Sequence, residues 1–135
     1  MPVTTVLIVD DGVASREAIE LALLGIDGLS LLHASDGRQA WECITSAAGG
    51  RIGAVITDLR MPVLDGFELI VRIRGDAMAS RLPVIVVSGE TDANACERAL
   101  ALGADAYFPK PWSPLQLRVK LEQLLYERNA TPCPE

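Results

Sequence analysis

Histidine and cysteine are scarce in this chain of 135 residues, which has one histidine and three cysteines. Cys43, Cys96 and Cys133 form no CxxC pair, and their spacing to His33 matches no zinc site. We therefore interpret Cys43 and Cys96 as small core residues, Cys133 as a free thiol and His33 as structural. Unpaired cysteines favour a reducing compartment, so we expect a cytoplasmic protein.

Long apolar runs and excess positive charge are also lacking. No apolar stretch approaches the ~20 residues that a membrane-spanning helix needs, and the N-terminus has no basic segment of the kind that begins a signal peptide. The net charge of −6 repels phosphate backbones, so direct nucleic-acid binding is not expected. With 50% hydrophobic residues and no internal linker or repeat, the chain is suited to one buried core.

Five short apolar runs alternate with segments of helical pattern. The runs are Val6–Val9, Leu29–Leu32, Ala54–Ile56, Val84–Val87 and Ala106–Phe108. Because they are continuous rather than alternating, they predict strands that are covered on both faces. The segments between them are long enough for crossover helices. The pattern therefore predicts an α/β fold in which a parallel sheet has helices on both faces.

The first four helical segments carry recognisable signals. The first two have apolar stripes at helical spacing, namely Ile19, Ala22, Leu23 and Ile26, then Ala40, Ile44, Ala47 and Ala48. The third begins at Asp65 with Glu68 at capping-box spacing. The fourth is expected from about Asp92 to Leu102, ending at Gly103.

The fifth helical segment begins with a cap at Ser113, proline at the first helical position and Gln116 at the third. Its buried stripe is Leu117, Leu121, Leu124 and Leu125. We place the folded domain at residues 1–128. Residues 129–135 contain two prolines, and we expect them to form a disordered tail.

Polar side chains follow four of the five apolar runs. Asp10 and Asp11 come after the first, Asp58 after the third, Ser88 after the fourth and Lys110 soon after the fifth. In open parallel sheets, ligands bind beyond the carboxyl ends of the strands. We therefore expect the three carboxylates, the hydroxyl and the ammonium to converge on one edge of the sheet, an arrangement that can place the carboxylates within a few ångström of each other.

Such a cluster of carboxylates is unstable without cations. Two unit charges ~4 Å apart repel by roughly 4 kcal/mol at an effective dielectric constant of ~20. A divalent cation removes this penalty, and an all-oxygen ligand set points to Mg²⁺ or Mn²⁺ rather than zinc. A metal ion, a lysine and a hydroxyl suit a transferring phosphoryl group, which a carboxylate can accept as an aspartyl phosphate.

Five motifs carry a resemblance to the receiver domains of two-component response regulators, including those of chemotaxis. They are Val9-Asp10-Asp11, the segment Thr57–Gly66, Val87-Ser88-Gly89, Gly103-Ala104-Asp105 and Lys110-Pro111. The resemblance covers about residues 5 to 127. It implies a doubly wound (βα)5 fold with a five-stranded parallel sheet of flavodoxin-like order 2-1-3-4-5.

The resemblance implies a role for each carboxylate. Asp58 would accept the phosphoryl group from a phosphohistidine on a sensor histidine kinase or a histidine phosphotransfer protein. Asp11 and Asp58 would bind Mg²⁺ directly, together with the backbone carbonyl of Arg60, and Asp10 would act through a water. The alternative for Asp10 and Asp11 is a cap on the first helix.

The resemblance also implies a switch. Lys110 would pair with the phosphoryl oxygens, and its bond to Pro111 would be cis. Ser88 and Tyr107 would move on phosphorylation and change the face made by the fourth helix, fifth strand and fifth helix, which a downstream protein would read. The alternative for Tyr107 is a half-buried aromatic at the end of the sheet. The chain would not be a conventional enzyme, but it would catalyse its own phosphorylation and dephosphorylation.

Arg60 and Glu90 are the most individual residues of the expected site. By similarity they stand where water approaches the phosphoryl group, two residues beyond Asp58 and Ser88. We expect a salt bridge between them that slows hydrolysis. The alternative is that both side chains point into solvent.

Three competing functions fit the sequence less well. An aspartyl-phosphate phosphatase needs an acid two residues after its nucleophile, where this chain has Arg60. A flavodoxin-like carrier needs backbone donors for phosphate after the first strand, where Asp10 and Asp11 would repel it. A receiver that is never phosphorylated would not need all five polar site positions.

The sequence is compatible with two ways of passing the signal on. The chain fits a stand-alone receiver, or the receiver of a longer transcriptional or enzymatic regulator. Ala106 replaces an acidic residue that is common in receivers that pair to drive DNA binding, which disfavours that class. A homodimer that forms on phosphorylation is a further alternative.

Overall fold

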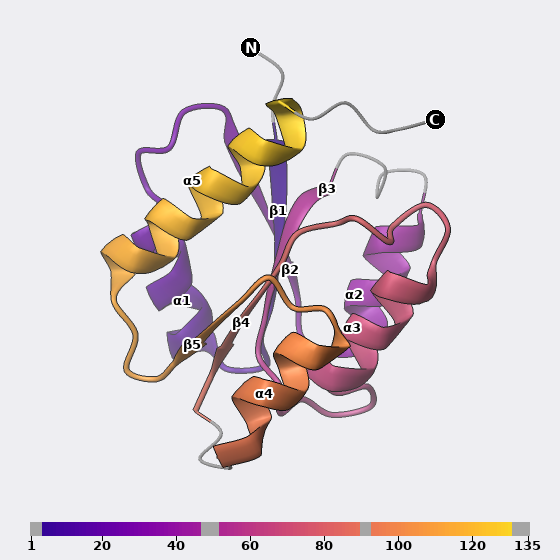
Figure 1. Cartoon of the computed structure of the whole chain (residues 1–135). Helices are drawn as coiled ribbons and strands as arrows, with labels where there is room; N and C mark the ends of the chain where they lie inside the picture. The colour runs from indigo at the N-terminus through magenta and orange to yellow at the C-terminus, as the bar shows by residue number, and fades with distance from the viewer. Residues whose placement is uncertain (1–3, 47–51, 90–92, 131–135) are drawn as a thin grey trace.

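One five-stranded parallel sheet forms the centre of the molecule (Figure 1). The computed structural model describes residues 4–46, 52–89 and 93–130. The strands are β1 (Thr4–Val9), β2 (Leu29–Ala34), β3 (Ile52–Thr57), β4 (Val84–Ser88) and β5 (Ala106–Pro109). Their order is β2-β1-β3-β4-β5, which confirms the expected topology. The order reverses at β1 and β3, so the crevice for a ligand lies beyond the carboxyl ends of these two strands.

Five helices cover the two faces of the sheet. They are α1 (Val13–Ala22), α2 (Gly37–Thr45), α3 (Gly66–Gly75), α4 (Ala93–Leu102) and α5 (Pro114–Ala130). In Figure 1, α1 and α5 lie on one side of the sheet and α2, α3 and α4 on the other.

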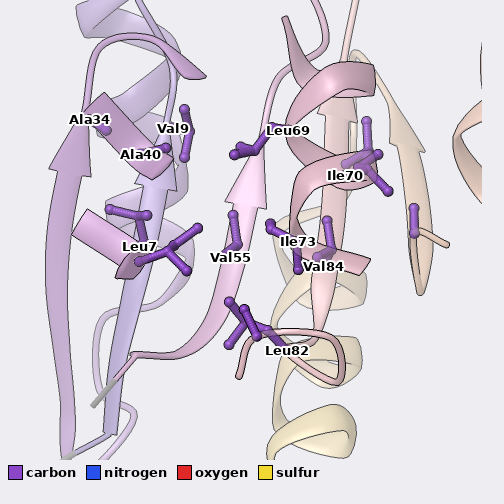
Figure 2. Packing of buried hydrophobic residues seen from close by; sticks show 14 of the residues in the cluster. Leu7, Val9, Ala34, Ala40, Val55, Leu69, Ile70, Ile73, Leu82 and Val84 are labelled. Carbon is purple, nitrogen blue, oxygen red and sulfur yellow. The ribbon is translucent and has the colours of Figure 1, made fainter. Parts of the chain in front are cut away.

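Each face of the sheet has its own apolar cluster, because successive side chains of a strand point to opposite faces. Leu7 and Val55 pack with Leu69 of α3 on one face (Figure 2), whereas Ile8 and Ile56 pack on the α1 and α5 side. All five side chains are shielded from water, and full burial of each contributes about 1.5–3 kcal/mol. The continuous apolar runs thus supply both clusters at once.

The two edge strands are less buried than the sequence predicted. Every residue of β3 and β4 is buried, but Leu32 and His33 of β2 are exposed. The expectation that all five strands are covered on both faces is therefore wrong for the edges, where each strand has a neighbouring strand on one side only. His33 Nε2 lies 3.0 Å from Glu20 Oε1 at the surface, which agrees with a structural role.

The signals at the ends of α3, α4 and α5 are confirmed. Asp65 Oδ1 accepts a hydrogen bond from the Glu68 backbone N–H at 2.9 Å. Ser113 Oγ does the same for the Gln116 N–H at 3.2 Å. Gly103 directly follows α4 with φ +118°, a left-handed conformation that favours glycine.

Two helix boundaries differ from the prediction. The first helix ends at Ala22, so Ile26 packs against the core from the following turn, where Gly25 has φ +88°. The last helix continues to Ala130 and so includes the first two residues of the segment 129–135 that was expected to be a tail, because neither Asn129 nor Ala130 breaks a helix.

Several residues named from the sequence lie outside the described ranges: Ala47, Ala48, Glu90, Asp92 and Cys133. Cys43 and Cys96 are free thiols and are half-buried rather than fully within the core. Within residues 4–46, 52–89 and 93–130, no helix is long and apolar enough to cross a bilayer.

Candidate functional site

The carboxyl edge of the sheet gathers the polar residues that the strand ends predicted. Asp10 follows β1 and Asp58 follows β3, and their backbones continue the sheet hydrogen bonds: the Asp58 N–H donates to the Val9 carbonyl at 3.0 Å. Ser88 ends β4, and its carbonyl accepts from the Lys110 N–H at 2.9 Å. Four neighbouring strands therefore hold this edge together.

Asp58 is 9% exposed and is held by hydrogen bonds on both carboxylate oxygens. Its Oδ1 accepts from the Leu59 backbone N–H at 2.6 Å and, more weakly, from the Arg60 N–H at 3.4 Å. Its Oδ2 lies 3.2 Å from Lys110 Nζ. A carboxylate fixed in this way is oriented for attack on an electrophile that enters from the open side of the site.

Asp10 is the most deeply buried charged group of the site, at 2% exposure. Its Oδ1 accepts from the Gly12 N–H at 2.8 Å. Its Oδ2 has no hydrogen-bond partner, and the Lys110 ammonium is 4.0 Å away. One lysine thus offsets the charges of two carboxylates, Asp10 and Asp58.

The unpartnered oxygen of Asp10 is a physical reason to expect a cation here. Only two buried side-chain oxygens lack a partner in the described part of the chain, and the other is Ser15 Oγ in the first turn of α1. Buried polar atoms without partners call for a bound ion or water. The hard oxygen donors of Asp10 and Asp58 suit Mg²⁺.

Asp11 is not gathered with the other two carboxylates. It is exposed and lines an open pocket beside the site, together with Arg60. In residues 4–46, 52–89 and 93–130, no three histidine, cysteine or acidic side chains are grouped as a metal site. The three carboxylates therefore do not form a ready metal site in this structure, in which the Lys110 ammonium lies near both Asp10 and Asp58.

The capping alternative for Asp10 and Asp11 is wrong. The residue that caps α1 is Gly12, and no side chain accepts a hydrogen bond there. Asp10 instead points its Oδ1 at the Gly12 N–H. The aspartate pair is therefore available for the site.

The β3–α3 loop shapes the floor of the site through close backbone packing. The Gly66 N–H donates to the Leu59 carbonyl at 2.9 Å, and a Cβ at Gly66 would collide with the Asp58 carbonyl oxygen. Within the loop, the Leu64 N–H donates to the Pro62 carbonyl, and this tight turn places Val63 between them at φ 71°. The sequence predicted the turn and the cap at Asp65, but not this unusual valine.

The residues of the expected switch lie on adjacent strands. Ser88 is 1% exposed at the end of β4. Tyr107 is half-buried on β5 and pairs in register with Val86. The Lys110–Pro111 peptide bond is cis, as expected.

One residue near the site was not found from the sequence. Arg98 of α4 lines the same pocket as Asp11 and Arg60, and its guanidinium lies 4.0 Å from the centre of the Phe67 ring. In the sequence it is an arginine on an ordinary helix, and no local pattern marks it.

The model of the response regulator receiver domain matches residues 6–122. The chain belongs to this family. Its receiver domain is 32% identical over 119 residues to the chemotaxis protein CheY1 of Helicobacter pylori, covering 88% of this chain and 94% of that protein. It is 36% identical over 132 residues to the response regulator MprA of Mycolicibacterium vanbaalenii, covering 98% of this chain but 53% of that protein.

Solved structures agree with this membership. A response regulator from Chloroflexus aurantiacus superposes with a TM-score of 0.83 and 30% identity, covering 93% of this chain and 99% of that one. The receiver domain of the sensor histidine kinase PA1611 from Pseudomonas aeruginosa superposes with a TM-score of 0.78 and 26% identity, covering 92% of this chain and 98% of that one. That structure was solved with magnesium in its active-site cleft. This chain is therefore a receiver domain of two-component signalling, a family that works with histidine kinases and downstream targets.

Proposed function

We propose that this receiver domain takes a phosphoryl group onto the Asp58 carboxylate. A carboxylate oxygen forms a bond to phosphorus while the bond from phosphorus to the imidazole nitrogen of a phosphohistidine breaks. The observation that carries the proposal is the Lys110 ammonium, which lies 3.2 Å from Asp58 Oδ2 and 4.0 Å from Asp10 Oδ2. It can offset charge on both the acceptor and the transferred group.

Asp10, Asp11, Asp58 and the Arg60 carbonyl would hold Mg²⁺, with Mn²⁺ as the alternative. The unpartnered Asp10 Oδ2 and the magnesium in the related PA1611 receiver support this assignment. When bound, the ion offsets negative charge on the phosphoryl oxygens. Asp11 acts from the pocket wall, and Asp10 orients a water from within the protein.

The donor is a sensor histidine kinase or a histidine phosphotransfer protein in the cytoplasm. The target is a protein that reads the face of α4, β5 and α5, either as a partner of a stand-alone receiver or as part of a longer regulator. Relatives support both alternatives: the matched region spans 94% of CheY1, a protein of similar length, but only 53% of the longer regulator MprA.

The switch runs through Ser88 and Tyr107. Ser88 is buried beside Lys110, so a small movement brings its hydroxyl to a phosphoryl oxygen, and Tyr107 fills the space that it leaves. Moving the equilibrium from 1:99 to 99:1 needs about 5.5 kcal/mol, which several charge-assisted hydrogen bonds can supply. A structure with a bound phosphoryl mimic in which both side chains keep their places would contradict this mechanism.

Arg60 and Glu90 control the lifetime of the phosphoryl group by a salt bridge across the path of water. Arg60 is exposed at the mouth of the site, and Glu90 lies outside the described residues. Loss of phosphate from Arg60→Ala, Glu90→Ala and the double variant tests the pair, since coupled residues give non-additive rates.

The experiment for the proposed function is intact-mass measurement after incubation with acetyl phosphate and Mg²⁺. The wild type is expected to gain one phosphoryl group, and Asp58→Asn none, because the amide is not a nucleophile for this reaction. Chelation of Mg²⁺ by EDTA is expected to suppress the gain. Equal labelling of the wild type and Asp58→Asn would contradict the assignment.

A further inference from the structure

An open pocket of about 500 Å³ lies directly beside the acceptor. Leu59 and Arg60, the two residues after Asp58, form part of its wall, and Arg98 of α4 forms another part. The remaining lining residues are Asp11, Met61, Pro62, Asp65 and Phe67. A molecule whose phosphoryl group is bound at Asp58 therefore has an open space beside it for the rest of the molecule.

Arg98 is the unusual member of this pocket. Its guanidinium is stacked on the Phe67 ring at 4.0 Å, and in the described part of the chain it makes no hydrogen bond or ion pair. A guanidinium that stacks on an aromatic ring contacts it through its flat face. Its N–H groups lie in its own plane, so they remain able to donate hydrogen bonds to other partners. Arg98 is thus positioned to donate hydrogen bonds to an oxygen atom in the pocket.

The charges of the pocket favour a ligand with a negative oxygen. Asp65 is already used, because its Oδ1 caps α3. Asp11 is assigned to the metal ion in the proposed function. Arg60 is paired with Glu90 in the proposed function, so Arg98 is the cationic group of the lining that serves a ligand, while Met61 and Phe67 offer apolar contact. An acyl group has both features: an apolar carbon chain and a carbonyl oxygen.

We propose that this pocket is a subsite for the acyl group of small acyl phosphate donors, and that Arg98 makes the receiver selective for them. The inference rests on the proposed phosphorylation of Asp58. An Asp58 oxygen bonds to phosphorus as the bond from phosphorus to the bridging oxygen breaks, and the electron pair leaves with the carboxylate. Arg98 donates hydrogen bonds to the acyl oxygen, on which negative charge grows in the transition state.

Two donors with different leaving groups test the subsite. Acetyl phosphate releases acetate, whereas phosphoramidate releases ammonia, which has no oxygen for Arg98 to bind. Arg98→Ala is expected to slow labelling by acetyl phosphate about three- to tenfold, the effect of one lost hydrogen bond at an exposed group. Labelling by phosphoramidate is expected to stay at the wild-type rate. Rates come from intact mass over time at several donor concentrations.

The matched control is Arg72→Ala, which removes an exposed arginine from α3 away from the pocket and is expected to leave both rates unchanged. Equal slowing of both donors by Arg98→Ala would overturn the subsite, because Arg98 would then act on the phosphoryl group or the fold. Unchanged rates with both donors would overturn it as well. No labelling of the wild type by either donor would contradict the proposed function itself.

Discussion

At the scale of single residues, the site is organised around one ammonium group. Lys110 Nζ lies 3.2 Å from Asp58 Oδ2 and 4.0 Å from Asp10 Oδ2. The positions of these three residues were predictable, because parallel topology brings the carboxyl ends of β1, β3 and β5 to one edge. The outward position of Asp11 and the stacking of Arg98 on Phe67 were not, since they depend on side-chain directions that no spacing encodes.

The buried charge of Asp10 leads to a stability prediction. Without a metal ion, its Oδ2 is a buried acceptor with no hydrogen-bond partner. Asp10→Asn removes this charge but keeps an oxygen for the Gly12 N–H, so the free energy of unfolding in EDTA is expected to rise by about 1 kcal/mol. With saturating Mg²⁺ this gain is expected to shrink or reverse, because ion binding stabilises the wild type more.

Urea denaturation in EDTA and in Mg²⁺ measures both effects. Asp27→Asn is the matched control, because Asp27 is exposed in the turn before β2. It is expected to change the free energy of unfolding by less than about 0.5 kcal/mol under both conditions. An Asp10→Asn protein that is less stable than the wild type in EDTA would show that the buried carboxylate is stabilising without a metal ion.

At the scale of elements, the β3–α3 loop was only partly predictable. The capping box at Asp65 was readable, since it depends on residues three apart in sequence. The contact between the Gly37 N–H and the Leu64 carbonyl, at 3.1 Å, was not, because it joins the start of α2 to a distant loop. This contact and the one between Gly66 and Leu59 fix the loop that carries the acceptor.

Hydrogen bonds from Arg74 explain the motif Gly103-Ala104-Asp105. Arg74 of α3 donates to the Gly103 carbonyl and to Asp105 Oδ2, and also to the carbonyls of Ser80 and Leu82. Asp105 Oδ2 additionally accepts from the Val84 N–H at 2.8 Å. The motif therefore anchors the loop before β5 to α3 and β4, and it serves the fold rather than the chemistry.

Gly66→Ala tests whether the loop backbone is packed as tightly as described. The new Cβ would collide with the Asp58 carbonyl oxygen, so we expect a loss of about 2 kcal/mol in the free energy of unfolding. Gly75→Ala is the matched control at the other end of α3, where a Cβ meets nothing within 4 Å. It is expected to be neutral or slightly stabilising, since alanine favours helix. Equal effects in urea denaturation would contradict the packing argument.

At the scale of the whole molecule, the sequence predicted the fold well because three signals agree. The apolar runs, the helix caps and the polar residues at the strand ends all indicate the same (βα)5 arrangement, and the structure has it. The exposure of the edge strands was missed, since an apolar run does not reveal its place in the sheet. Asn129 and Ala130 were assigned to the tail although they belong to the last helix, because both residue types are compatible with helix and with a tail.

Whether Asp58 carries the phosphoryl group can be tested by mapping the labelled residue by mass spectrometry. Trypsin cleavage after Arg51 and Arg60 releases the peptide 52–60, whose only acidic side chain is Asp58. Borohydride reduction after labelling with acetyl phosphate and Mg²⁺ converts an acyl phosphate to an alcohol, which gives homoserine from aspartate. Homoserine is expected at position 58, in this peptide alone. Homoserine in the peptide that contains Asp10 and Asp11, with peptide 52–60 unmodified, would contradict it.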